Sequence, residues 1–150
     1  MRNTVITLLC FATLGIVTIS ATLDQSIATT NYATEQGIQF TEGSFNDILK
    51  KAKKEKKNIF LDAYASWCGP CKMLKRDVFP QAQVGEFFNK NFINVAMDME
   101  KGEGIQLSQK FKITAYPTLL FINDKGEVIG SALGYHSADK LIQVAKPFVK

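Results

Sequence analysis

Two cysteines near the middle of the chain carry the clearest chemical signal. Cys68 and Cys71 lie three residues apart, and residues at that spacing share one face of a helix, so their sulfurs can close a small disulfide ring. If Cys68 begins the helix, unpaired backbone N–H groups and the positive end of the helix dipole stabilise its thiolate. Because the thiolate is the nucleophile of disulfide exchange, the pair predicts thiol–disulfide chemistry.

The residues between and beside the cysteines favour the approach of a second disulfide. Pro70 suits the first turn of a helix, where its missing N–H has no partner to lose. Gly69 has no side chain that would obstruct a substrate. Trp67 offers a flat apolar surface beside the sulfur, although packing in the core would also account for a tryptophan here. These three residues are candidate substrate-binding positions.

Two other roles for a C-x-x-C pair are open. Structural zinc takes four nitrogen or sulfur ligands, and beyond the pair only His136 remains, alone in a predicted loop. A static structural disulfide is the other alternative. The pair follows a buried strand and opens a helix, and that placement favours redox chemistry over both. We expect no metal site.

The strand and the helix that position the pair can be read from the sequence. Residues 59–65 are mostly apolar without clean alternation, which is typical of a strand buried on both faces. A helix is expected from Cys68 or Gly69 to about Val78, and Pro80 ends it. The strand is therefore expected to deliver Cys68 to the start of the helix.

The rest of the chain alternates between strand and helix patterns. Ser44 is a good N-cap for an amphipathic helix that Asn58 ends, and the sequence Asn123-Asp124-Lys125-Gly126 predicts a turn between two strands. The remaining predicted elements are a strand at 38–40, helices at 44–56, 83–90 and 102–110, strands at 92–97, 117–122 and 127–133, and a last helix capped by Ser137. This order predicts an α/β fold in which helices flank both faces of a central mixed β-sheet.

The N-terminal part of the chain is expected to lie outside the folded domain. Residues 5–19 form an apolar run after Arg2 that is shorter than the ~20 residues of a membrane span and fits a signal peptide. We predict a signal peptide over 1–20, with an N-terminal membrane anchor as the alternative, a flexible linker over 21–37 and the domain over 38–150. Cys10 lies in the apolar run and leaves with it on cleavage. Export is therefore expected.

The composition argues against two further classes of protein, nucleic-acid binders and disulfide-stapled scaffolds. The 150 residues carry a formal charge of +4, and 46% are hydrophobic, as in an ordinary globular domain. The lysine-rich run over residues 50–57 is better explained as the exposed end of a helix than as an anion-binding patch. We therefore expect no nucleic-acid partner. Three cysteines at these positions also do not form a structural disulfide framework.

Several motifs resemble the thioredoxin family. The matching pieces are the stretch from Asp62 to Lys72, the later Ala115-Tyr116-Pro117-Thr118-Leu119, and Gly134, and the resemblance covers roughly residues 38–150. Residues 77–84 are similar to exported members, including the C-terminal thioredoxin domain of the periplasmic reductase DsbD. The resemblance implies a thioredoxin-like fold and a protein-disulfide reductase. No nicotinamide, flavin or metal cofactor is implied, since the cysteines carry the electrons.

The resemblance also implies a role for each site residue. Cys68 is the attacking thiol and Cys71 the resolving thiol, and the two form the redox disulfide. Asp62 matches the family's buried acid, and burial raises the pKa of such a carboxyl so that it can exchange protons with Cys71. Tyr116-Pro117 matches the family's cis-proline, where Pro117 packs against the disulfide and the Tyr116 backbone binds a substrate strand.

Two features depart from cytoplasmic thioredoxins. Those proteins usually place a lysine near the buried acid, and the strand at 92–97 contains none. Their active-site helix also continues past a proline kink near the cysteines. Here the proline comes later, at Pro80, so the helix is expected to end rather than bend.

The predicted function is the reduction of disulfides in exported proteins, most naturally in the periplasm. A membrane electron donor would return the cysteine pair to the dithiol. A disulfide oxidase or isomerase is the first alternative, because the reduction potential depends on details that a sequence does not show. A non-catalytic binding module of the same fold is the second alternative, and such a module has no need for both thiols, the proline and the acid together.

Overall fold

The computed structural model describes residues 37–150. The predicted signal peptide or anchor over 1–20, which contains Cys10, and the predicted linker up to residue 36 lie outside the described residues. Within the described part of the chain, no helix is long and apolar enough to cross a membrane.

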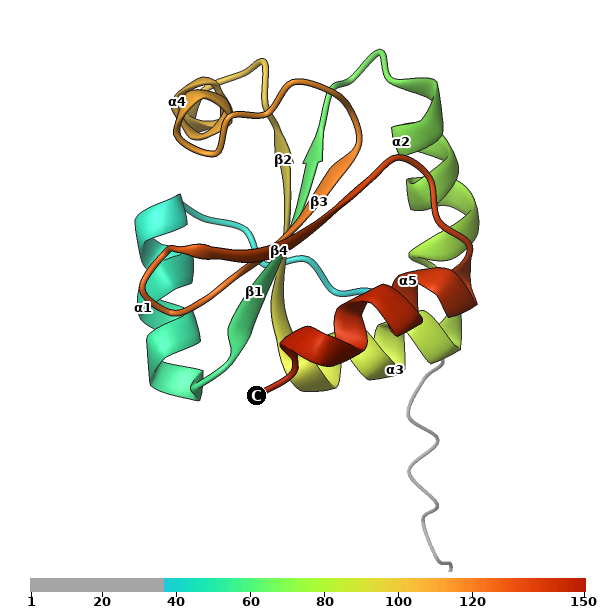
Figure 1. The fold of residues 1–150 in the computed structure, drawn as a ribbon, viewed down its shortest axis with the longest axis horizontal. Helices are drawn as coiled ribbons and strands as arrows, with labels where there is room; N and C mark the ends of the chain where they lie inside the picture. The colour runs from blue at the N-terminus through green and yellow to red at the C-terminus, as the bar shows by residue number, and fades with distance from the viewer. Residues whose placement is uncertain (1–36) are drawn as a thin grey trace, which may run out of the picture. The chain divides into compact units, whose positions relative to one another are not determined.

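Strands and helices alternate along the described domain (Figure 1). In chain order they are α1 (Phe45–Glu55), β1 (Asn58–Tyr64), α2 (Gly69–Met73), the π-helical η1 (Leu74–Val78), α3 (Ala82–Asn91), β2 (Phe92–Asp98), α4 (Glu103–Lys110), β3 (Thr118–Ile122), β4 (Val128–Leu133), α5 (Ala138–Ala145) and the 3₁₀-helical η2 (Lys146–Phe148). The strands form one sheet in the order β2-β1-β3-β4. β1 runs parallel to β2 and antiparallel to β3, and β3 runs antiparallel to β4, so the predicted mixed sheet is confirmed.

Helices cover both faces of this sheet, as predicted. In Figure 1, α1 and α4 lie on one side of the strands, and α2, α3 and α5 lie on the other. Successive strand residues point to opposite faces. Accordingly, Ile59 and Leu61 of β1 pack in the core that includes α1, while Phe60 packs in the core beneath the other helices. β1 is buried on both faces, and only Tyr64 at its end is partly exposed.

The ends of the first helix and of the β3–β4 hairpin follow local chemistry. The Ser44 side chain caps α1 by accepting the N–H of Asp47 at 3.2 Å. Lys56 caps the end of the helix in a left-handed conformation, with φ at 55°, so the predicted end at about Lys56 is confirmed, whereas the residue that stops the helix is Lys56 and not Asn58. Asn58 instead opens β1. The predicted turn before β4 is confirmed, with Gly126 at a φ of 84° that glycine adopts without strain.

The strand predicted at 38–40 does not form. The backbone N–H of Ile38 donates to the carbonyl of Phe79 at 2.7 Å, and that of Thr41 donates to the carbonyl of Asn94 at 2.7 Å. The segment is thus hydrogen-bonded through Ile38 to the residue after η1 and through Thr41 to β2. A strand needs a continuous ladder to one neighbour, and these bonds do not supply it.

The helix that follows the cysteine motif changes its hydrogen-bond pattern midway. It is α-helical to Met73 and then π-helical, with the N–H of Phe79 bonded to the carbonyl of Leu74, five residues earlier, at 2.9 Å. The wider turn changes which side chains face the sheet, and such turns are frequent at functional sites. The helix ends before Pro80, as predicted.

Candidate active site

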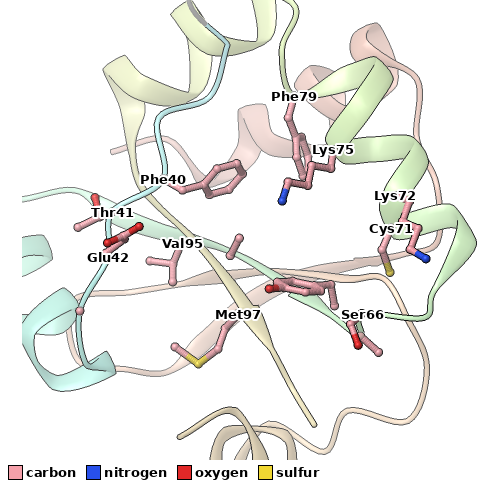
Figure 2. Close-up of a pocket in the computed structure, with 14 residues that line it drawn as sticks. Phe40, Thr41, Glu42, Ser66, Cys71, Lys72, Lys75, Phe79, Val95 and Met97 are labelled. Atoms are coloured by element: carbon pink, nitrogen blue, oxygen red, sulfur yellow. The ribbon is translucent and has the colours of Figure 1, made fainter. Parts of the chain in front are cut away.

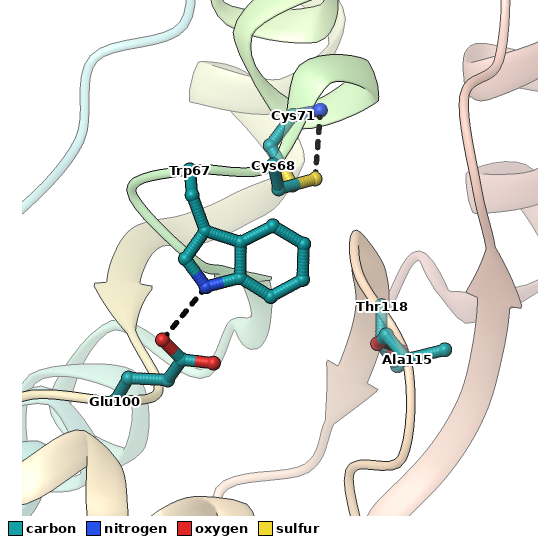
Figure 3. Close-up of a disulfide and its surroundings, with 6 residues drawn as sticks. All are labelled: Trp67, Cys68, Cys71, Glu100, Ala115 and Thr118. Atoms are coloured by element: carbon teal, nitrogen blue, oxygen red, sulfur yellow. Dashed lines mark hydrogen bonds between the residues drawn. A yellow bond between two sulfur atoms is a disulfide. The ribbon is translucent and has the colours of Figure 1, made fainter.

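β1 leads directly into the cysteine motif. After a short turn in which the N–H of Cys68 donates to the carbonyl of Ala65 at 3.0 Å, Cys68 caps α2. Cys71 lies in the first turn of α2, and its N–H donates to Cys68 Sγ at 3.2 Å (Figure 3). The two sulfurs are bonded at 2.05 Å, with the Cα atoms 5.4 Å apart. The structure therefore joins the two cysteines that the spacing paired.

The disulfide is buried, but the space beside it is open. Cys68 is 2% exposed and Cys71 5% exposed, and Tyr64 and Tyr116 pack against them. A Cβ atom added to Gly69 would meet no atom within 4 Å. Gly69 therefore leaves an unobstructed approach next to the pair, which is the property that its missing side chain predicted.

Trp67 projects from the surface beside the pair instead of packing in the core. Trp67 is 66% exposed. Its indole Nε1 donates to a Glu100 carboxylate oxygen at 2.8 Å (Figure 3). The indole ring meets the edge of Tyr116 with ring centroids 5.9 Å apart. Glu100 is itself held by the bond from its N–H to Asp98 Oδ1 at 3.1 Å. The indole is thus fixed in place from two other parts of the chain.

Replacing Glu100 with alanine is expected to release the indole while leaving the fold almost as stable. The hydrogen bond is exposed, so its loss should lower the free energy of unfolding by about 1 kcal/mol or less. Because Trp67 is the only tryptophan in the sequence, time-resolved fluorescence anisotropy reports on its motion alone, and the fast component should grow. Glu86→Ala, which removes an exposed acid on α3, is the matched control. Equal anisotropy decays for the two variants would contradict the restraint.

The loop before β3 reaches the cysteine pair from a separate part of the chain. The Tyr116–Pro117 peptide bond in this loop is cis. Pro117 is buried, and its carbonyl accepts the N–H of Gly134 at 2.8 Å. The Thr118 hydroxyl donates to the carbonyl of Ala115 at 2.7 Å. These bonds hold the loop while the Tyr116 side chain packs against the cysteines.

Asp62 lies in the middle of β1, on the same face as Tyr64, which packs against the cysteines. The residue is 4% exposed, and its Oδ1 has no hydrogen-bond partner among the described residues. Burial raises the pKa of Asp62 to about 7, and the charge of Lys75 acts in the opposite direction. A carboxyl with this pKa gives and takes protons close to neutral pH.

Lys75 is a site residue that the sequence analysis did not identify. No lysine stands in β2 near the acid, but Lys75 of η1 supplies the positive charge that acts on Asp62. Lys75 and Cys71 both line a cavity of about 630 Å³ (Figure 2). The available signal was spacing, because Lys75 follows Cys71 by four residues and such residues share a helix face.

Two further residues that the sequence singled out are His136 and Pro70. His136 lies in the loop before α5 with its Nδ1 3.0 Å from the carbonyl of Gly134. Across residues 37–150, no group of three or more histidine, cysteine, aspartate and glutamate side chains could hold a metal ion. Pro70 lies in the first turn of α2, the position that its missing N–H predicted.

Comparison with known proteins agrees with this geometry. Residues 45–148 match the family described as the thioredoxin-like domain. The chain belongs to this family of thiol–disulfide oxidoreductases, and it carries the family's cysteine pair as a closed disulfide. The resemblance to the thioredoxin family is thereby confirmed.

Three relatives illustrate the range of the family. A solution structure from Bacteroides thetaiotaomicron, of a protein proposed to be a disulphide-isomerase, is 48% identical with a TM-score of 0.67, over 74% of this chain and 92% of that one. An H-type thioredoxin of Oryza sativa subsp. indica is 33% identical over 63% of this chain and 75% of its own length. The thiol:disulfide interchange protein DsbD of Pseudoalteromonas atlantica is 30% identical over 68% of this chain.

Some relatives are much longer proteins. The chain spans 18% of the length of that DsbD protein. It spans 13% of the length of a peptide-N(4)-(N-acetyl-beta-glucosaminyl)asparagine amidase from Caenorhabditis briggsae, to which it is 34% identical over 83 residues. The similarity to these two proteins therefore concerns only a part of each.

Proposed function

We propose that this protein is an exported thiol–disulfide oxidoreductase that reduces disulfides of other exported proteins. The observation that carries the proposal is the disulfide between Cys68 and Cys71 at the start of a helix, with free space over Gly69 beside it. A disulfide that served only to hold the fold together would need no open approach. A disulfide that exchanges with a substrate needs one.

The reaction begins from the dithiol form. The Cys68 thiolate attacks one sulfur of the substrate disulfide, the bond between the two substrate sulfurs breaks, and the leaving thiolate takes a proton from water. Cys68 is then held in a mixed disulfide. The Cys71 thiolate attacks Cys68 Sγ, releases the second substrate thiolate and closes the intramolecular disulfide. Two electrons pass from the protein to the substrate.

The site contains a backbone N–H group, that of Cys71, which can stabilise the thiolate of Cys68. The N–H of Cys71 donates to Cys68 Sγ in the disulfide form. In the dithiol form the same N–H, at the first turn of the helix, would stabilise negative charge on that sulfur. This interaction favours Cys68 as the attacking thiolate.

Asp62 is the proposed proton acceptor for Cys71. The second step needs the Cys71 thiol to lose its proton, and Asp62 lies on the face of β1 that is directed toward the cysteines. Because burial raises the pKa of Asp62 to about 7, the carboxylate takes up a proton readily at neutral pH. The transfer passes directly or through one water molecule.

Five residues around the pair are proposed to bind the substrate. Trp67 provides an exposed ring that Glu100 and Tyr116 hold in place. Gly69 and Pro70 form the unobstructed edge of the helix start. The backbone of Tyr116, before the cis-proline Pro117, would pair with an extended substrate segment as a short added strand.

The proposed setting is the periplasm. The apolar run near the N-terminus supports export, with a cleaved signal peptide or a retained membrane anchor. The similarity to DsbD supports partners that are disulfide-containing proteins or other redox proteins. The oxidised pair must be reduced again after each cycle, and we propose a membrane electron donor for this step.

An isomerase is the second candidate. The observation that favours it is the 48% identity to the Bacteroides protein that is proposed to be a disulphide-isomerase. An isomerase would attack with Cys68 in the same way, but it would release a rearranged substrate in place of a reduced one.

The reduction potential of the Cys68–Cys71 pair separates these functions. For a reductase we expect a value near that of thioredoxin, about −270 mV, and far from that of the oxidant DsbA, about −120 mV. Equilibration of the purified protein with glutathione or dithiothreitol buffers gives the value. Turnover of insulin, compared with refolding of a scrambled substrate, provides the matching activity. A potential near the oxidising end, with refolding faster than insulin reduction, would replace the reductase by an oxidase or isomerase.

A further inference from the structure

The neighbours of Asp62 within the sheet carry no charge. In the parallel pairing with β2 the residue opposite Asp62 is Ala96, and in the antiparallel pairing with β3 it is Leu119. Ala96 is exposed on the edge strand and lines the cavity next to the cysteines. The sheet therefore buries the carboxyl between uncharged neighbours, and one of them, Ala96, borders the cavity.

The cavity that Ala96 lines has a volume of about 630 Å³, and charged groups enter it from the surrounding elements. Its walls are mainly apolar, with Phe40 and Phe79 among them. The ionisable residues that line it are Tyr64 from β1, Cys71 and Lys72 from α2, Lys75 from η1 and Glu42 from the segment before α1. Figure 2 shows the Lys75 side chain extending from the helix into the pocket.

Lys75 is the cation in this set that acts on Asp62. Burial raises the pKa of Asp62, and the positive charge of Lys75 holds it lower than burial alone would. Lys72, the other lysine at the cavity, has no such effect on Asp62. Glu42 is the competing anion, because it lies at the same cavity and could also attract the Lys75 ammonium.

We propose that Lys75 is a positioning residue that keeps a larger fraction of the buried Asp62 ionised, and therefore able to accept the Cys71 proton, with its charge brought to the cavity by the helix that carries both cysteines. This inference rests on the proposed function, since it concerns the resolving step. The proton balance is simple: the Cys71 thiol gives one proton to the Asp62 carboxylate. The resulting thiolate then breaks the mixed disulfide.

The placement has a physical reason in the fold. A cation at the mouth of an apolar cavity interacts with a buried carboxylate through a medium of lower dielectric constant than water. The π-helical turn that starts at Leu74 sets the side from which Lys75 leaves the helix. Because Lys75 and Cys71 belong to one continuous helix, the same element carries the thiol and the charge that assists its deprotonation.

The test is the titration of Asp62 in the oxidised full-length protein, where the cysteines are bonded and do not titrate. The ¹³C shift of the Asp62 carboxyl should show a midpoint near 7 in the wild type. In Lys75→Met the midpoint should move upward by about one pH unit, and in the matched control Lys72→Met it should not move. An unchanged midpoint in Lys75→Met, or equal changes in both variants, would overturn the proposal.

A second measurement separates a role in positioning from a role in folding. With Asp62 titrating about one pH unit higher, the ionised fraction at pH 7 falls from about one half to about one eleventh, so the resolving step should slow about fivefold. Its pH profile should move upward by the same amount, and Lys75→Arg should keep the wild-type profile. In Lys75→Met with Ala96→Lys, a cation placed opposite Asp62 on β2 should restore the midpoint.

The outcomes distinguish this inference from the function on which it rests. A wild-type protein that reduces no protein disulfide would overturn the proposed function, whatever the titration shows. Active protein in which Lys75→Met keeps the wild-type midpoint and profile would overturn the role of Lys75 and leave the proposed function standing. Failure of the Ala96→Lys substitution to restore the midpoint would also count against a purely electrostatic role.

Discussion

Replacing Cys68 with serine is expected to reduce the disulfide-reductase activity below detection, whereas replacing Cys71 with serine should stop the reaction halfway. A serine hydroxyl at position 68 is not a thiolate and cannot attack a disulfide at neutral pH. In Cys71→Ser the attack by Cys68 still occurs, but no second thiol resolves the product. The variant should therefore accumulate a mixed disulfide, which mass spectrometry of the unreduced protein detects.

The control for these two variants is Ser66→Ala, which changes a residue that neighbours the cysteines and carries no sulfur. It should retain the wild-type rate of insulin reduction. The double variant Cys68→Ser, Cys71→Ser tests the remaining alternative. If cells that carry the double variant keep the full function of the protein, the fold acts as a binding module and the cysteine chemistry is dispensable.

Replacing Asp62 with asparagine is expected to change how stability depends on pH. The folded protein holds the Asp62 proton with a pKa of about 7, while an unfolded aspartate has a pKa near 3.9. Between these values the folded state binds more protons than the unfolded state, so the free energy of unfolding falls as pH rises. Above pH 7 this loss is complete and corresponds to about 4 kcal/mol. An asparagine at position 62 does not titrate and removes the dependence.

The measurement is urea denaturation of the wild type and Asp62→Asn from pH 4 to pH 8. The stability difference, variant minus wild type, should be about 4 kcal/mol larger at pH 8 than at pH 4. The same variant should resolve mixed disulfides more slowly, because its amide accepts no proton from Cys71. Parallel stability profiles for the two proteins would show that the folded Asp62 titrates like an exposed carboxyl.

Asp124→Asn is a control for which stability should change with pH in the opposite direction. The hydrogen bond from Lys150 lowers the pKa of Asp124, so its contribution to stability is present at neutral pH and is lost as pH falls through the folded-state pKa. Because this pair is exposed, the effect should be small. A comparison of the two aspartates therefore checks both the direction and the site of the Asp62 effect.

Local features of the sequence predicted most elements of the fold. Ser44 marked the start of α1, Gly126 marked the turn before β4, and Pro80 marked the end of the cysteine helix. Each of these depends on backbone preferences within a few residues, which a sequence displays directly. The C-x-x-C pair belongs to the same group, since both sulfurs lie on one helical turn and the disulfide joins residues three apart.

The prediction of a short strand at 38–40 was wrong because strand formation depends on contacts with distant residues. Its apolar alternation is local, but whether Ile38 and Thr41 form a ladder depends on which backbone groups lie beside them. In the folded chain those groups belong to Phe79 and Asn94, which come from different elements. The hydrogen bonds are satisfied, yet no strand results.

The class of chemistry could be inferred from the residues themselves, because two cysteines three residues apart at the start of a helix can close and reopen a disulfide there. The charged partners of Trp67 and Asp62 were decided by the tertiary packing. Glu100 accepts a hydrogen bond from the Trp67 indole 33 residues away, and the charge of Lys75 lowers the pKa of Asp62. Such contacts depend on how β1, β2 and the cysteine helix are placed in space. The four-residue spacing puts Lys75 on the same helix face as Cys71, but it does not predict which acid Lys75 acts on.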